Sequence, residues 1–277
     1  MRKLLCANFA RVFRSRVFWI CMAFHIGLGV LLVCSQYREQ IQYGPGNGSM
    51  DHIVFGYALI IGIPCAVFCS LFFGAEYSDG TIRNKLVVGH TRTSIYLANL
   101  ITCIAAVLLM CAAFLATVFA IGTPLLGCLS VDSQFMAWVL LGSVVMTAAY
   151  CCLCLMLSML NQNKTVVAIL AILGVCLLLL AAATINAKLN APEFYDGYVF
   201  TDSLGNASTE SFPNPEFLRG TARAVYEFFY DFLPSGQGLQ YANLEATHLW
   251  QMPLYSLGIS LVSTGFGLIL FRKKDLK

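Results

Sequence analysis

Three cysteines close together in the sequence, Cys151, Cys152 and Cys154, are the residues whose type and spacing best suit metal chemistry in this 277-residue chain. Their thiolates would bind a metal such as zinc. No His or carboxylate lies near them in the sequence, however, and adjacent residues of a helix point in different directions. We therefore predict that these thiols pack as small side chains. We predict no metal site and no catalytic residue.

His25 is a second residue that could do chemistry, because a lone His within an apolar segment can relay protons. The apolar stretches contain no carboxylate to partner it, so we expect a hydrogen bond to a neighbouring helix instead. A protease or lipid-modifying transferase would need paired acids or a nucleophile–base set, which argues against an enzyme. The chain also contains no G-x-x-x-x-G-K-[ST] phosphate loop, so it cannot hydrolyse ATP by the usual route.

Six apolar stretches must position these residues, and none of them contains Asp, Glu, Lys or Arg. A membrane-spanning helix needs about 20 apolar residues, and one central charge costs roughly 2.5–3.5 kcal/mol of insertion. The composition, 58% hydrophobic and 11% charged, agrees. The sequence predicts an all-α polytopic membrane protein with six transmembrane helices. The predicted spans are about 17–37, 53–75, 94–121, 134–160, 165–187 and 248–271.

The charges predict the orientation of these spans. An even number of spans places both termini on one side, which then holds 13 of the 17 basic residues and 3 of the 14 acidic ones. Because basic residues accumulate on the cytoplasmic side, we predict a multi-pass plasma-membrane protein with both termini in the cytoplasm. The basic residues lie beside the span ends, so we expect contact with membrane lipid and no nucleic-acid binding.

Two further segments flank or interrupt the spans. Residues 1–16 combine apolar side chains at helical spacing with basic ones, which predicts a cytoplasmic amphipathic helix in the membrane interface before the 17–277 transmembrane domain. The outer segment 188–245 is rich in loop residues in its first half. Its second half predicts an amphipathic helix at 221–233, ended by Pro234. That helix is either interfacial or re-entrant, or a packed cap with no role in transport.

The loop at 76–92 between the second and third spans has the most informative polar pattern. Glu76 lies where the second span leaves the membrane, and Asp79-Gly80 breaks the helix. The following residues predict a short amphipathic helix with Ile82, Leu86 and Val87 toward one side, stopped by Gly89. Apolar side chains on a cytoplasmic helix make sense if a soluble partner has a groove for them.

This loop carries a family resemblance. The run E-Y-S-D-G-T-I-R-N-K-L at Glu76–Leu86, followed by T-R-T-S at Thr91–Ser94, resembles the membrane permease subunits of type-2 ATP-binding-cassette (ABC) exporters. Similar features are the basic N-terminal helix, the six spans, F-Y-D-F-L-P at Phe229–Pro234 and F-R-K-K-D-L at Phe271–Leu276. One departure is Asn99, where many relatives have a Lys.

The resemblance implies a half-transporter that works as a dimer with a second permease copy, either identical or a close paralogue. A separate cytoplasmic ABC ATPase would bind ATP and Mg, and this chain would hold no cofactor itself. If the roles of the matching residues in the family apply here, Glu76 and Arg92 would hold the loop at its two ends. The surface that couples the permease to the ATPase would consist of Thr81, Ile82, Arg83, Leu86 and Val87.

The scarcity of charges within the spans favours amphipathic or hydrophobic cargo, and similarity to peptide exporters suggests peptides. Candidate residues lining the translocation pathway are Phe18, Met22, His25, Phe55, Tyr57 and Phe68. An ion-coupled carrier or channel would usually show carboxylates at membrane depth or a filter-like loop, and the sequence shows neither. A non-transporting sensor or immunity subunit that couples to an ATPase shares every feature of the exporter, so the sequence leaves it open.

Overall fold

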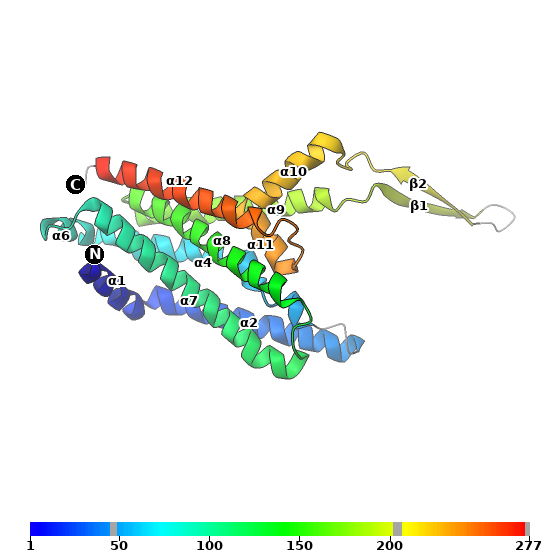
Figure 1. The fold of residues 1–277 in the computed structure, drawn as a ribbon, viewed down its shortest axis with the longest axis horizontal. Coiled ribbons are helices and arrows are strands. Elements are labelled where there is room, and N and C mark those ends of the chain that lie inside the picture. Colours follow the sequence, from blue (N-terminus) through cyan, green and yellow to red (C-terminus); the bar gives the residue numbers. More distant parts are fainter. Residues whose placement is uncertain (45–48, 202–206, 275–277) are drawn as a thin grey trace.

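The computed structural model describes residues 1–44, 49–201 and 207–274. Within these residues six helical segments are long and apolar enough to cross a membrane, which confirms the predicted all-α polytopic class. The segments run roughly side by side along the long axis of the molecule (Figure 1). They are α2 (Arg16–Tyr43), span two (Met50–Tyr77), α7 (Arg92–Leu126), α8 (Ser133–Leu160), α9 (Lys164–Leu189) and α12 (Gln251–Lys273).

Span two and α8 form the centre of the bundle. In their apolar windows 67% and 61% of residues are buried, against 33% or less for the other four spans. Span two is built from short pieces rather than one continuous helix. These pieces are η1 (Met50–His52), α3 (Gly56–Ile60), α4 (Gly62–Phe68), the π-helical η2 (Cys69–Phe73) and α5 (Ala75–Ser78). π-Helical turns are rare and often mark functional sites.

The N-terminus and the last turn of α12 lie at one end of the bundle, together with α1 (Arg2–Arg14) and α6 (Thr81–Val87) (Figure 1). We call this the terminal end. Helix α1 buries Leu4, Asn8 and Val12, which are spaced four apart and share one face, and it packs on α7. Helix α6 is bounded by Gly80 and Gly89, whose φ values of +63° and +93° are readily adopted by glycine alone.

The opposite, distal end carries the segment between α9 and α12, and its first half differs from the prediction. Instead of loop, the structure has an antiparallel hairpin of β1 (Phe194–Thr201) and β2 (Ala207–Pro213). It projects beyond the bundle (Figure 1). The run of aromatic and β-branched residues in β1 suits a strand, but the Gly and Pro residues around it led us to predict loop.

The second half of this segment contains two helices. The predicted amphipathic helix is present as α10 (Gly220–Phe232), but Pro234 begins another helix, α11 (Pro234–Asn243), because Pro is well suited to a first helical position. Most of α11 is buried, and it packs on α3, α8 and α9. At Gly238 a Cβ atom would lie 2.5 Å from the carbonyl oxygen of Ala58, so this close approach of α11 to α3 requires glycine. The helix that enters the bundle is therefore α11.

Candidate functional site

The carboxylate of Glu76, at the terminal end of span two, is fully buried and has three donors. Its Oε1 atom accepts hydrogen bonds from Arg11 Nη1 at 2.5 Å and from Lys85 Nζ at 2.7 Å. Its Oε2 atom accepts from Asn99 Nδ2 at 2.8 Å. These residues belong to α1, α5, α6 and α7, so the Glu76 side chain joins three consecutive helices to the first helix of the chain.

Asn8 closes this arrangement into a ring. Its Nδ2 donates to Asn99 Oδ1 at 2.8 Å, and its Oδ1 accepts from Lys85 Nζ at 3.2 Å. Arg11 also donates to the backbone oxygen of Phe72 at 3.2 Å and stacks over the ring of that residue at 4.2 Å. We call Asn8, Arg11, Glu76, Lys85 and Asn99 the Glu76 hub.

The charges of the hub explain its stability. Burial lowers the pKa of Lys85, while the neighbouring Glu76 carboxylate acts in the opposite direction and favours the ammonium. Two cations face one anion, and all three charges have partners. Asn99 occupies a position where the family resemblance leads one to expect a Lys. Since Asn carries no charge, Lys85 and Arg11 supply the positive charge that Glu76 requires.

Tyr77, the next residue, makes contacts with a different set of elements. Its hydroxyl donates to the backbone oxygen of Met159 near the end of α8. The ammonium of Lys274, which follows α12, donates to the backbone oxygen of Leu160 at 2.8 Å and lies 4.3 Å from the Tyr77 ring. A cation beside the last carbonyls of a helix satisfies groups that have no partner within the helix. Glu76 and Tyr77 together therefore connect α5 to the ends of five other helices.

Arg92, at the other end of the predicted coupling loop, is bonded to the end of α12. Its Nη1 donates to the backbone oxygens of Phe271 and Arg272 at 3.1 and 3.2 Å, and also to that of Lys274. The structure thus attaches the 76–92 loop to the bundle through side chains at both of its ends.

The predicted coupling surface on α6 is exposed only in part. Ile82 is only 1% exposed and packs in the core, and Leu86 is partly buried against it, whereas Val87 and Val88 are 79% and 76% exposed. Thr81 is partly buried, and Arg83 and Asn84 are exposed. Because a helix turns every 3.6 residues, Ile82 and Leu86 share one face and Arg83 and Val87 share another. The surface open to a partner, here called the outer face of α6, consists of Arg83, Asn84, Val87 and Val88.

The predicted pathway residues do not lie on an open surface of the single chain. Of the six, only Met22 is partly exposed; the buried ones are Phe18, His25, Phe55, Tyr57 and Phe68. They pack against one another or bond within the bundle. The rings of Phe18 and Phe68 are 6.4 Å apart, and the Tyr57 hydroxyl lies 2.8 Å from the hydroxyl of Ser143.

His25 likewise differs from the expected contact with a neighbouring helix. Its Nδ1 lies 2.8 Å from the backbone oxygen of Cys21 in its own helix, and its Nε2 has no partner among the described residues. The role of these six residues as the lining of a pathway stays a prediction.

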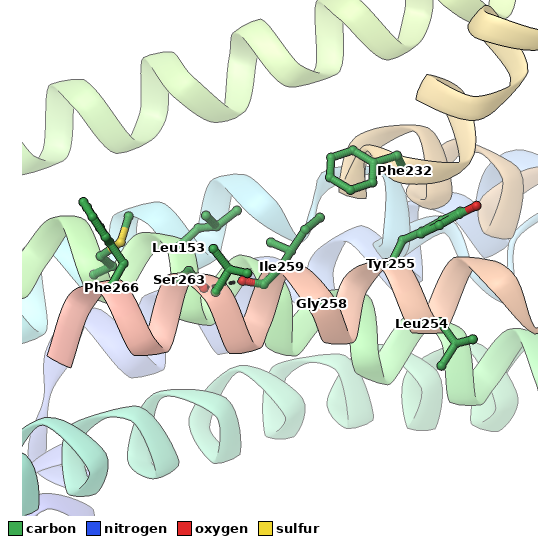
Figure 2. A pocket seen from close by; sticks show the side chains of 10 residues that line it. Leu153, Phe232, Leu254, Tyr255, Gly258, Ile259, Ser263 and Phe266 are labelled. Carbon is green, nitrogen blue, oxygen red and sulfur yellow. Dashed lines mark hydrogen bonds between the residues drawn. The ribbon is translucent and has the colours of Figure 1, made fainter. Parts of the chain in front are cut away.

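An apolar groove of about 480 Å³ lies instead along α12, bordered by α8 and α10. Figure 2 shows Tyr255, Ile259 and Ser263 along α12, with Phe232 of α10 near one end and Phe266 near the other. The rings of Phe228, Phe232 and Tyr255 form an aromatic cluster at the α10 end. Gly258 leaves the middle of the groove open, because nothing lies within 4 Å of a Cβ atom built there.

A polar pocket of about 490 Å³ lies at the distal end. Asp231 is one of its lining residues; His248 Nδ1 lies 2.8 Å from its Oδ2, and Gln240 donates to its Oδ1 at 3.0 Å. The charged lining comprises three carboxylates, those of Asp231, Glu227 and Glu245, and one guanidinium, that of Arg223. Asp231 lines this pocket and the next residue, Phe232, lines the apolar groove, so the two sites meet at the end of α10.

Four hub residues, Asn8, Arg11, Lys85 and Asn99, were not predicted from the sequence to act together. One signal was present: Asn8 lies midway between Leu4 and Val12 on the apolar face of α1, where a buried amide needs a hydrogen-bond partner. Lys85 likewise shares a face with Ile82, three residues before it. Those positions indicate a buried polar cluster, but nothing in the sequence indicates that the partner is Glu76.

We predict that Glu76→Gln strongly destabilises the protein, because it leaves Arg11 and the nearly buried Lys85 without a counter-charge. Removing one partner of a buried ion pair costs about 3–5 kcal/mol. The matched control is Glu193→Gln, which removes the partner of the exposed Arg219 and should cost about 1 kcal/mol or less. Thermal unfolding of both purified variants in detergent measures the difference, and equal midpoints would contradict the assigned role of the hub.

Comparison with known proteins identifies the family. No curated protein matches the chain. A family model described as ABC-2 family transporter protein matches residues 4–178, which is more than half of the chain and includes most of α1, the Glu76 hub and the first four spans. The chain therefore belongs to the ABC-2 family of transporter proteins and is a multi-pass membrane permease.

Proposed function

We propose that this chain is the permease subunit of an ATP-driven exporter of amphipathic cargo, and that it works as a dimer with a second permease copy. Family membership supports the transport role and implies a partner ABC ATPase. One observation supports the docking site of that ATPase: α6 exposes Val87 and Val88 on one face while its other face is bonded to the Glu76 hub.

The distribution of charge supports the orientation that this proposal requires. The terminal end carries most of the basic residues, which favours its placement in the cytoplasm. The outer face of α6 then lies where a soluble ATPase can reach it. Two exposed valines beside Arg83 suit a partner groove that is apolar with an acidic rim.

The hub provides a physical route from this docking surface to the spans. Lys85 on α6 is bonded to Glu76 at the end of span two, and Glu76 is bonded to Asn99 in α7. Pulling α6 away from the bundle would separate buried opposite charges, which costs several kcal/mol. A movement imposed on α6 by ATPase closure is therefore passed to span two, α7 and α1 together.

The groove and the polar pocket support amphipathic cargo. An apolar part would lie along α12, in the groove that continues to Phe232. A polar part would reach the pocket around Asp231, where three carboxylates against one guanidinium favour a cationic group. A cationic amphipathic peptide has both properties, so we propose this class of cargo.

The outer face of α6 can be tested without disturbing the core. We expect Val87→Asp with Val88→Asp to weaken ATPase binding on the order of 100-fold, because two exposed apolar side chains lose their contact with the partner. The thermal unfolding midpoint of the permease alone should not change, since neither side chain packs in the bundle. Co-purification with the ATPase and ATP turnover in lipid measure the effect.

Two further variants are the controls for this experiment. Val87→Ile with Val88→Ile keeps an apolar surface and should retain the ATPase. Ile82→Ala removes a core side chain and should lower stability by about 2–5 kcal/mol. A complex that forms equally well with the double Asp variant would exclude the outer face of α6 as the docking surface.

The cargo groove can be tested with two glycines of α12. Gly258 lines the groove and Gly265 does not, and a side chain at either position meets open space. We expect Gly258→Leu to raise the peptide concentration needed to stimulate ATP turnover about tenfold, because the added side chain occupies the groove. Gly265→Leu should leave stimulation by cationic amphipathic peptides unchanged. Identical behaviour of the two variants would place the cargo elsewhere.

A further inference from the structure

Five buried cysteines from three spans converge in the middle of the bundle. The sulfur atoms of Cys65, Cys69 and Cys103 all lie within 4.8 Å of one another. Cys69 Sγ is 3.2 Å from Cys103 Sγ, and Cys65 Sγ is 3.7 Å from Cys151 Sγ. Cys154, three residues after Cys151 on α8, is also buried. We call Cys65, Cys69, Cys103 and Cys151 the thiol cluster.

The spacing of these sulfurs suits a shared metal ion. Thiolates bound to one metal at about 2.3 Å are separated by about 3.8 Å in a tetrahedral arrangement and about 4 Å in a trigonal one. The separations of 3.2 and 3.7 Å lie just below these values, so an ion could be accommodated with small side-chain movements. Cys65 and Cys69 are spaced four apart, which places both thiols on one face of span two.

The backbone at the cluster is unusual as well. Cys69 is the first residue of η2, the π-helical turn of span two, and such turns frequently occur at functional sites. The π-helical turn changes the angular position of the residues after Cys69 relative to a regular α-helix. This observation is independent of the sulfur distances.

The chemistry of the surroundings selects the class of ion. Four thiol sulfurs are soft ligands, which favour soft ions over Mg²⁺ or Ca²⁺. The four thiols are fully buried. Structural zinc is almost always held by four ligands, whereas among the described residues only the sulfurs of Cys65, Cys69 and Cys103 all lie within 4.8 Å of one another, and Cu(I) is satisfied by two or three soft sulfur ligands. Each thiol that binds as a thiolate releases one proton, and no electron transfer is involved.

We propose that the thiol cluster binds one soft monovalent metal ion of the Cu(I) or Ag(I) class. An ion would reach it from the terminal end. Cys103 lies four residues beyond Asn99 in α7, about 6 Å along the helix axis, so the cluster is one turn deeper in the bundle than the Glu76 hub. The thioether of Met159, another soft donor, lies 3.6 Å from Asn99 Nδ2 at the hub itself.

Copper binding by the full-length chain tests this proposal. Protein purified in detergent under reducing conditions is loaded with Cu(I), challenged with a Cu(I)-specific chelator, and assayed for copper retained per chain. We expect about one retained ion per chain, surrounded by sulfur atoms at about 2.3 Å in X-ray absorption spectra. Cu(I) should also raise the thermal unfolding midpoint, because it binds the folded state.

Two double cysteine variants, one within the thiol cluster and one outside it, distinguish the cluster from other buried thiols. Cys65→Ser with Cys69→Ser should weaken Cu(I) binding by at least about 100-fold. Loss of a residue that only hydrogen-bonds to a metal ligand can lower metal affinity by up to about 100-fold, and this variant removes two ligands themselves. Cys21→Ser with Cys111→Ser removes two buried thiols outside the cluster and should retain the ion. If the first variant does not fold, Cys103→Ser replaces it. Absence of chelator-resistant copper in the unaltered chain, or equal retention by the cluster variant, would overturn the proposal.

Discussion

The arrangement of the terminal end depends on one buried carboxylate, that of Glu76, which is stable only while its hydrogen-bond and charge partners stay in contact with it. Glu76 is surrounded by protein, and a buried charge is tolerated only where opposite charges and hydrogen-bond donors meet it. Arg11 comes from the first helix, Lys85 from α6 and Asn99 from α7. Because all of them converge on the same two oxygens, these elements cannot separate without exposing a charge to an apolar environment. The constraint makes the terminal end of the bundle one mechanical unit.

Span two extends this unit through the whole protein. Its terminal end carries Glu76, its middle carries Cys65 and Cys69, and its distal part carries Ala58, against which α11 is packed through Gly238. The span is made of short helical pieces with a π-helical turn between the thiols and the hub. A segmented span can shift at its joints more readily than a continuous helix. Under the proposed function, such a span would carry movement from α6 toward the polar pocket at the distal end and the apolar groove along α12.

The sequence predicts the parts of this fold that follow from local patterns. Long uncharged stretches determine the six spans, and Gly80 and Gly89 determine the limits of α6. The distribution of apolar residues on α6 was predicted less well. Ile82, Leu86 and Val87 were assigned to one face, but Val87 is exposed because the other two turn toward the bundle to bring Lys85 to Glu76. Contacts that determine such a rotation lie far away in the sequence.

The same reason explains the other omissions. Asn99 is known from the sequence only as a departure from the family pattern. The hydrogen bonds of its side-chain amide to Asn8 and Glu76 join residues that are 91 and 23 positions apart. Cys151 and Cys154 were predicted to pack as small side chains, because no His or carboxylate lies near them in the sequence. Cys151 Sγ lies 3.7 Å from Cys65 Sγ of span two, a contact that only the packing of the spans creates. The α11 helix was missed because Pro234 was taken as a stop, although Pro also suits a first helical position.

Hydrogen–deuterium exchange of the Glu76→Gln variant, compared with the unaltered chain, tests the central claim most directly. If the carboxylate holds α1, α6 and the start of α7 as one unit, the amides of Arg2–Arg14 and Thr81–Val87 should exchange faster together, while those of α10 and α11 stay as protected as before. Faster exchange limited to α5, with α1 and α6 unchanged, would show that Glu76 is only a local contact and would contradict the account.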